Sequence, residues 1–250
     1  MGEEFTKKCY GDVYTLTHNP EYPPAKYQDF LDFKKMIDDD EGWTMKSNKN
    51  GNEVYFREEG NEEILQLKLR STALKDIDVE VLHDVVQDPN FREEWDKTMM
   101  KQYVIEQINE NTEVGYYSVK MPFMLTNRDW TNYRSWWFNK ERTLFIIFNY
   151  SVKHPKVPEI KGFRRGNSLK TGYVLEKTPE GTKFGYFAWN CWNGNIPSWC
   201  VNTAAKSMIS GVVDDLRKAC LKYPEWKAKH FPEEKYWMKE GEVIQQTNNN

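Results

Sequence analysis

The chain carries the stretch DPNFREEWD at residues 88–96, and this stretch has the features of a short helix. Asp88 is a residue type that accepts hydrogen bonds at a helix start, and Pro89 suits the first helical position, whose amide needs no partner. Arg92 and Asp96 lie four residues apart, so their side chains can meet on one helix face. The pair is either a surface ion pair that contributes about 0–1 kcal/mol or a charged pair with a function. Residue chemistry alone leaves both readings open.

Strand-forming residues dominate the chain after this helix, from residue 102 to residue 189. Aromatic and β-branched residues are enriched there, and turn signals separate the runs. The expected strands are Val114–Met121, Trp130–Phe138, Leu144–Tyr150, Leu169–Glu176 and Phe184–Trp189. A long helix is then expected from Ser198 to Lys222, ended by Pro224, which does not suit a helix interior.

The chain before residues 88–96 changes its hydrophobic period from helical to alternating. The expected elements are a helix at Lys26–Asp39, a hairpin of strands 43–48 and 53–58, a strand at Ile64–Arg70 and a short helix at Val79–Val86. In the strand at Ile64–Arg70, three leucines alternate with Gln66, Lys68 and Arg70. Successive side chains of a strand point to opposite faces, so this pattern predicts one dry face and one wet face.

The order of these elements predicts an α+β fold in one domain. A curved antiparallel sheet can wrap around the long C-terminal helix, and the gap between them is a natural place for an internal apolar cavity. Residues 1–26 read as an irregular lead-in, residues 27–226 as the domain, and residues 227–250 as a polar tail expected to be disordered.

Composition excludes several classes of protein. The net charge of −3 and the pI near 5.9 lack the basic surface that nucleic acid requires, so no nucleic-acid partner is expected. No apolar run approaches the roughly 20 residues of a membrane span, and residues 1–10 lack the apolar core of a secretory signal, so a cytoplasmic protein is expected. The cysteines form no CxxC pair, and GxSxG and HExxH motifs are absent from the sequence. No metal, cofactor or catalytic residue is therefore predicted.

Three motifs together carry a resemblance to a known family. NFREEWD at residues 90–96 resembles the (Y/F)RxxWD helix of StAR-related lipid-transfer (START) domains, and NRDW at 127–130 is similar to that family's NRD segment. IPSW at 196–199 resembles the family's entry into its closing helix. The resemblance covers about Tyr27 to Tyr223. Within the family, the chain is most similar to the phosphatidylcholine-transfer subgroup, in particular its dual phosphatidylcholine/phosphatidylethanolamine carrier.

The resemblance implies a helix-grip (START) fold that encloses one phospholipid. In phosphatidylcholine-binding relatives the residue matching Arg92 meets the lipid phosphate, and the residue matching Asp96 holds that arginine. A guanidinium fork matches phosphate geometry, and a carboxylate partner offsets the burial of the cation. Tyr117 and Trp130 match positions whose rings surround the choline, although both residue types are also common in cores.

Three further positions predicted to line the cavity depart from the strict choline carrier. Leu169 occupies a third ring position, and Val86 and Thr171 stand where that carrier usually has tyrosine and glutamine. These departures leave room for ethanolamine beside choline.

The closing helix is expected both to pack on the sheet and to act as a lid that touches bilayers. Its predicted inward residues include Val201, Ala205, Met208 and Val212. Gly211 is expected to mark a bend within the helix. The basic residues Lys206, Arg217, Lys218 and Lys222 suit anionic headgroups, although simple solvation explains them equally well. Residues 121–125 resemble the loop at the cavity mouth, either exposed for docking or buried as a plug.

The predicted function is the binding of phosphatidylcholine or phosphatidylethanolamine and its exchange between membranes through transient membrane contact. Two other classes remain open: a START-type lipid sensor or adaptor that regulates a partner protein, and an enzyme on the helix-grip scaffold. A sterol or ceramide carrier is an alternative within the same class, and the Arg92–Asp96 pair beside two aromatic positions argues mildly against it.

Overall fold

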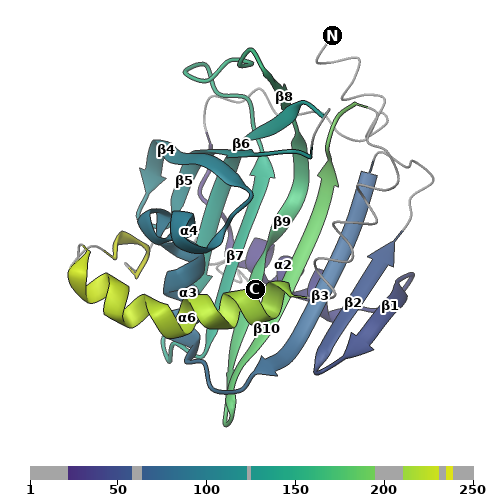
Figure 1. Ribbon diagram of the computed structural model, residues 1–250, viewed down its shortest axis with the longest axis vertical. Helices are drawn as coiled ribbons and strands as arrows, with labels where there is room; N and C mark the ends of the chain where they lie inside the picture. The colour runs from purple at the N-terminus through teal and green to yellow at the C-terminus, as the bar shows by residue number, and fades with distance from the viewer. Residues whose placement is uncertain (1–21, 58–63, 123–124, 195–210, 231–234, 239–250) are drawn as a thin grey trace, which may run out of the picture.

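A curved, almost wholly antiparallel sheet forms the framework of the molecule (Figure 1). The structure, a computed structural model, describes residues 22–57, 64–122, 125–194, 211–230 and 235–238. Its strands are β1 (Thr44–Lys49), β2 (Asn52–Arg57), β3 (Ile64–Leu74), β4 (Met99–Asn109), β5 (Thr112–Val119), β6 (Asn127–Phe138), β7 (Leu144–Ser151), β8 (Phe163–Arg165), β9 (Asn167–Thr178) and β10 (Gly181–Cys191). The strand order is β1-β2-β3-β10-β9-β7-β6-β5-β4, and β8 pairs with β6 in parallel.

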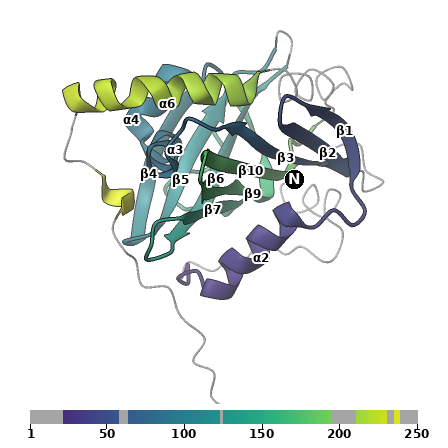
Figure 2. The same cartoon turned by 90° about the horizontal axis from the view of Figure 1, so that it is seen from below.

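Helices cover both faces of this sheet. They are α2 (Tyr27–Asp38), α3 (Val79–Gln87), α4 (Pro89–Trp95), α6 (Val212–Lys229) and a short 3-10 helix, η2 (Tyr236–Met238). Figure 2 shows α6 on one side of the sheet and α2 on the opposite side. The predicted α+β architecture, with a curved antiparallel sheet against a C-terminal helix, is confirmed.

Two apolar clusters follow from this arrangement, one on each face of the sheet. The inner cluster lies on the face that carries α3 and α6, and includes Leu69, Leu82, Trp136, Ile147, Leu175, Phe184 and Leu216. The outer cluster lies under α2, and includes Phe30, Phe33, Ile37, Tyr133, Phe148 and Phe187. The predicted helix at Lys26–Asp39 thus buries its apolar stripe against the outer face.

Local signals placed several elements correctly. The hairpin turn puts Asn50 and Gly51 at φ angles of 53° and 76°, a left-handed pair that suits a tight two-residue turn. Asp88 caps α4, because its carboxylate accepts hydrogen bonds from the amides of Asn90 (3.0 Å) and Phe91 (3.3 Å). The predicted start of this helix is therefore confirmed.

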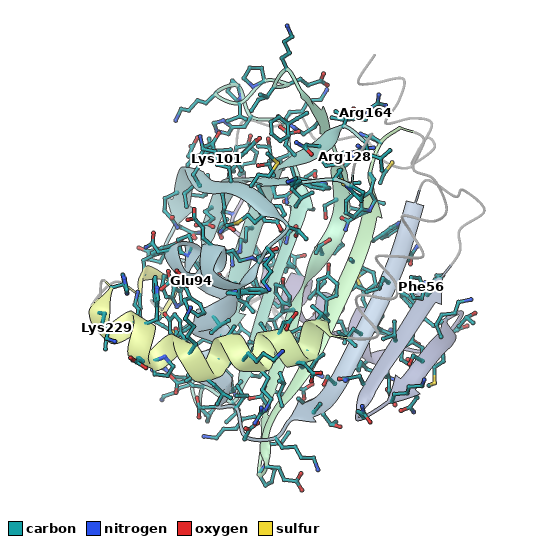
Figure 3. The ribbon with its side chains drawn as sticks, viewed as in Figure 1. Phe56, Glu94, Lys101, Arg128, Arg164 and Lys229 are labelled. Atoms are coloured by element: carbon teal, nitrogen blue, oxygen red, sulfur yellow. The ribbon has the colours of Figure 1, made fainter. Side chains whose placement is uncertain are left out.

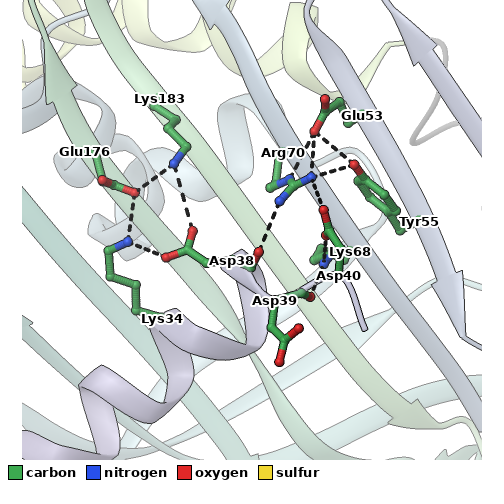
Figure 4. A network of polar contacts seen from close by, with 10 residues as sticks. All are labelled: Lys34, Asp38, Asp39, Asp40, Glu53, Tyr55, Lys68, Arg70, Glu176 and Lys183. Carbon is green, nitrogen blue, oxygen red and sulfur yellow. Dashed lines mark hydrogen bonds and ion pairs between the residues drawn. The ribbon is translucent and has the colours of Figure 1, made fainter. Parts of the chain in front are cut away.

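The prediction of a wet face on β3 is wrong. Gln66 and Lys68 are only 2% and 0% exposed. The C-terminal end of α2 and the residues after it lie over them, as Figure 4 shows for Lys68. Lys68 Nζ donates to a carboxylate oxygen of Asp40 at 2.6 Å, and Arg70 pairs with the other oxygen of Asp40 at 2.9 Å. The cations Lys68 and Arg70 are accommodated on this covered face because both pair with the carboxylate of Asp40.

The predicted end of the last helix at Pro224 is also wrong. α6 continues through Pro224 to Lys229. Its last turns are held by tertiary contacts, since Tyr223 and Lys227 donate to Asp88 at 3.0 and 2.9 Å. These contacts compensate for the backbone hydrogen bond that a proline removes.

The tail predicted to be disordered includes ordered residues. Trp237 in η2 is 2% exposed, and its indole nitrogen donates to Asp84 at 2.7 Å. Lys235 pairs with the second oxygen of Asp84 at 2.5 Å. Residues 235–238 therefore form part of the packed structure.

The lid prediction is only partly covered by the described residues. Val201, Ala205 and Met208 lie outside them, as do residues 123–124 of the predicted mouth loop. Val212 opens α6 and packs against the inner cluster. Gly211 directly precedes α6 as its N-cap residue, and because residues 195–210 lie outside the described ones, the bend expected at Gly211 stays a prediction. None of the described helices is long and apolar enough to span a bilayer.

Candidate functional site

Arg92 of α4 and Asp96, the C-cap residue of this helix, form a partly buried ion pair. The Nε and Nη2 atoms of Arg92 lie 2.9 and 2.8 Å from the same carboxylate oxygen of Asp96. The two side chains are 16% and 10% exposed, so the pair is largely withdrawn from water. A pair at this depth is more strongly coupled than a surface pair.

Asp96 is fixed from two further directions. The hydroxyl of Tyr117 on β5 donates to it at 2.8 Å, and the hydroxyl of Thr98 donates to its other oxygen at 2.8 Å. Burial raises the pKa of Asp96, but the charge of Arg92 and the three donors outweigh burial and hold the pKa below its usual range. Asp96 is therefore an ionised carboxylate whose position orients the guanidinium.

In the described part of the chain, the other neighbours of Arg92 are aromatic side chains. Its guanidinium carbon lies 4.4 Å from the ring centre of Trp95 and 5.7 Å from that of Tyr117. Tyr173 is a further neighbour of the guanidinium. Burial lowers the pKa of Arg92, but the neighbouring tyrosines and Asp96 outweigh burial and raise it. Asp96 is the one carboxylate within ion-pair distance of Arg92 in the described part of the chain.

Two tyrosines of this site were not identified from the sequence. Tyr173 on β9 and Tyr186 on β10 are register partners, and their ring centres are 5.4 Å apart. Burial raises the pKa of Tyr186, so its hydroxyl stays neutral. Strand alternation supplied a signal for Tyr173, because it lies two residues from Thr171 and so on the same face of β9.

An aromatic group continues the site along β5 and β6. Tyr117 pairs with Trp130 across the two strands, with ring centres 6.2 Å apart. Trp130 also meets Trp192 edge to face at 5.4 Å. Gly166 fits beside Trp130 because a Cβ there would lie 2.3 Å from the indole nitrogen. Trp192 is thus a further ring of the site that sequence analysis did not identify.

A row of small polar side chains crosses the same face of the sheet. Ser151 donates to Asn132 at 2.9 Å, and Thr171 donates to Asn190 at 3.1 Å. Register pairing joins the row, since Asn132 faces Ser151 and Thr171 faces Asn149. Of this row, the sequence predicted only Thr171.

The structure brings Arg92, Asp96, Tyr117 and Trp130 together, as the resemblance implied. Val86 belongs to the inner apolar cluster, and Leu169 is 2% exposed on β9. The roles of these residues toward a ligand stay predictions.

His83 and Asp84 of α3 have structural partners. His83 is fully buried, with its ring centre 4.5 Å from that of Phe145, and burial lowers its pKa to about 3. Asp84 binds Lys235 and Trp237. Among the described residues no group of three metal-ligating side chains is suitable for a metal ion.

Comparisons with known proteins identify relatives of this chain. The START domain family model matches residues 29–227. Human "START domain-containing protein 10" is 36% identical over 213 residues, which cover 84% of this chain and 72% of that protein. Mouse "Phosphatidylcholine transfer protein" is 31% identical over 146 residues, 57% of this chain and 67% of that protein. The crystal structure of human STARD10 superposes with a TM-score of 0.78 at 34% identity and covers 87% of each chain.

Proposed function

This chain belongs to the START domain family, and on that premise we propose that it binds one phospholipid molecule and exchanges it between membranes. Phosphatidylcholine and phosphatidylethanolamine are the proposed ligands. One relative is named for phosphatidylcholine transfer, and its similarity to this chain supports the choice. The residues of the site supply the chemistry that a phosphodiester needs.

The proposal rests on the environment of Arg92. Among the described residues Arg92 is a largely buried cation with one carboxylate partner, and Trp95, Tyr117 and Tyr173 are its other neighbours. A phosphate can replace a neutral hydroxyl partner of a guanidinium and gain a charge-assisted hydrogen bond. Asp96 keeps the guanidinium in one orientation and so reduces the entropy lost on binding. Arg92 is therefore the proposed phosphate ligand.

The cationic end of the headgroup is assigned to the aromatic group. Tyr117, Trp130 and Trp192 can attract a quaternary ammonium by about 0.5–2 kcal/mol for each well-placed ring. The primary ammonium of ethanolamine also needs hydrogen-bond acceptors. The carbonyl and hydroxyl oxygens of Asn190 and Thr171 are of this type. This mixture suits a carrier that accepts both headgroups.

The acyl chains contribute little to selectivity. Moving about 32 methylene groups into water costs roughly 25 kcal/mol, but moving them from a bilayer into an apolar interior leaves their environment nearly unchanged. The inner apolar cluster is the proposed surface for these chains. Lipid uptake therefore requires docking on a membrane, and discrimination falls to the polar end.

Vesicle-to-vesicle transfer of fluorescent phosphatidylcholine tests the role of Arg92. Arg92→Ala is expected to lower the transfer rate roughly tenfold or more, because it removes a charged hydrogen-bond donor from the phosphate. Arg70→Ala on the opposite face of the sheet is the matched control, since it also removes a partly buried, ion-paired arginine. Unchanged transfer by a folded Arg92→Ala variant would overturn the assignment.

The same proposal covers the cellular role. The protein is a cytoplasmic carrier with transient peripheral contact to membranes, and its lipid-binding unit extends past residue 226 to Met238. It acts as a carrier and not as an enzyme. A lipid sensor would extract lipid slowly from vesicles despite holding it, and an enzyme would turn its bound ligand over, so the transfer assay and product analysis distinguish the three roles.

A further inference from the structure

Residues 153–164 connect β7 to β8 and include the first two residues of β8. This segment carries a concentrated positive charge and is called the basic loop below. Its basic side chains are Lys153, Lys156, Lys161 and Arg164, and its single acidic residue is Glu159. All five are exposed. The chain as a whole has a net charge of −3, so this loop is a local reversal of sign.

The basic loop differs from α6, where sequence analysis expected basic residues to face anionic headgroups. On α6, Lys222 pairs with Glu94 at 2.7 Å and Lys218 pairs with Asp215 at 3.2 Å, and Arg217 pairs with Asp76. In the described part of the chain, Lys153, Lys161 and Arg164 have no ion-pair partner, and Lys156 lies 3.9 Å from Glu106. The unpaired positive charge is therefore in the loop and not on the helix.

Hydrogen bonds and an ion pair fix the conformation of the basic loop. Arg165 makes two hydrogen bonds of 3.0 Å to the carboxylate of Asp129, and its guanidinium also donates to the carbonyl of Pro158 at 3.2 Å. His154, which is 5% exposed, lies 2.8 Å from the carboxylate of Glu106. A loop fixed in this way presents its exposed side chains without a large loss of conformational entropy on binding.

An apolar residue lies among these charges. Ile160 is 38% exposed and directly precedes Lys161. Charged side chains around an exposed apolar residue fit the boundary of a bilayer, where lysines meet lipid phosphates and the apolar group enters the acyl region. Nucleic acid is disfavoured as the occupant because it offers no apolar layer for Ile160 and because the rest of the protein is acidic.

The basic loop is joined to the candidate site. Asn193 donates from its side chain to the carbonyl of Arg165 at 2.6 Å. Arg128, which is 2% exposed, donates to the carbonyl of Trp192 at 2.8 Å. Figure 3 shows Arg164 and Arg128 at the same end of the molecule. Trp192 contacts Trp130 of the site, so the loop and the headgroup rings belong to one end of the structure.

We infer that the basic loop docks on an anionic phospholipid bilayer and thereby orients this end of the protein toward the membrane. Lys156, Lys161 and Arg164 face the lipid phosphates, and Ile160 enters the headgroup boundary. The inference rests on the proposed function, because orientation matters for a protein that exchanges lipid with a bilayer. It adds a preference for anionic membranes that the headgroup site itself does not require.

Charge reversal in the loop tests this inference. Lys156→Glu/Lys161→Glu is compared with Lys46→Glu/Lys49→Glu on β1, which reverses two exposed lysines beside an exposed apolar residue, Met45, 46% exposed. Binding and transfer are measured with vesicles of phosphatidylcholine alone and with vesicles that also contain phosphatidylserine. The loop variant is expected to lose roughly tenfold in binding to the anionic vesicles, while the β1 variant retains it.

The salt dependence of vesicle binding and a substitution of Ile160 test the same inference further. The difference between wild type and the loop variant is expected to shrink as salt is raised, because exposed charges are screened within about 8 Å at physiological ionic strength. Ile160→Ser is expected to weaken vesicle binding in both lipid mixtures, and Met45→Ser is its control.

Each outcome has a distinct meaning. Equal loss of vesicle binding by the loop variant and the β1 variant overturns the docking assignment. Unchanged binding of the loop variant to anionic vesicles also overturns it and points to an acidic protein as the occupant. Mass spectrometry of the extracted ligand separates the two proposals, because a wild-type protein that carries no phospholipid contradicts the proposed function, whatever the loop does.

Discussion

The two faces of the sheet each hold a buried or partly buried cation in a different setting. On the outer face, Lys68 and Arg70 share Asp40, and Arg70 also pairs with Glu53 at 2.9 Å (Figure 4). On the inner face, Arg92 has one carboxylate within ion-pair distance among the described residues. The outer network thus gives Arg70 two carboxylate partners, whereas the other described neighbours of Arg92 are rings and hydroxyls.

This difference separates a structural role from a binding role. A buried cation surrounded by carboxylates has little to gain from a further anion. A buried cation completed by hydroxyls and rings gains a charge-assisted hydrogen bond when a phosphate arrives. The inner face therefore has the chemistry of a phosphate site, and the outer network ties the end of α2 to β3.

The largest expected effect comes from removing one carboxylate on each face. Asp96→Asn removes the one carboxylate that pairs with Arg92 among the described residues and is expected to lower the free energy of unfolding by about 3 kcal/mol. Glu53 is 34% exposed and Asp40 remains beside Arg70, so Glu53→Gln is expected to cost at most about 1 kcal/mol. Urea unfolding of both variants measures the difference, and equal costs would contradict the contrast between the two faces.

A second prediction concerns an outer-face lysine outside the network. Lys170 Nζ lies 3.9 Å from the ring centre of Phe148, and burial lowers the pKa of Lys170 to about 8. The folded pKa is thus below the unfolded value of 10.5, so the unfolded chain binds more protons between these two pH values. Stability is then expected to rise as pH increases from about 8 to about 10, and the full cost of burying the charge applies below pH 8.

Lys170→Met removes that cost. The variant is expected to be about 2 kcal/mol more stable than wild type at pH 7, after subtraction of the lost cation–π contact, and to lack the rise above pH 8. Thermal unfolding across pH 6 to 10 measures both effects. A variant with the same slope as wild type would show that Lys170 does not titrate in this window.

The smallest expected effect concerns the headgroup. Trp192→Ala removes one ring of the aromatic group but leaves the phosphate contact of Arg92 in place. Transfer of phosphatidylcholine is expected to fall about threefold relative to phosphatidylethanolamine, the equivalent of one exposed cation–π contact. A competition assay with both lipids gives the ratio, and an equal fall for the two lipids would remove Trp192 from headgroup selection.

The sequence was most informative where chemistry is local. The cap by Asp88, the four-residue spacing of Arg92 and Asp96, and the tight turn at Asn50 depend on neighbours along the chain. Such features are fixed by backbone geometry that spacing reveals. The pairing of Tyr117 with Trp130 required the family resemblance, because it depends on the register of two strands.

The errors and omissions depend on contacts between distant segments. Alternation along β3 could not show that α2 would cover Lys68 and neutralise it with Asp40. Pro224 is tolerated because Lys227, one turn beyond it, is held by Asp88, 139 residues away in sequence. Tyr186 joins the site through its pairing with Tyr173 on a neighbouring strand. Each of these outcomes is decided by tertiary packing that overrides local preference.

Native mass spectrometry of the purified protein, followed by identification of the extracted ligand, tests the central claim most directly. Wild type and the outer-face variant Arg70→Ala are predicted to carry one diacyl phospholipid per chain, with choline or ethanolamine as the headgroup. A folded Arg92→Ala variant is predicted to have lost most of it. Equal phospholipid occupancy in Arg92→Ala and Arg70→Ala, or a sterol in place of the phospholipid, would contradict the account.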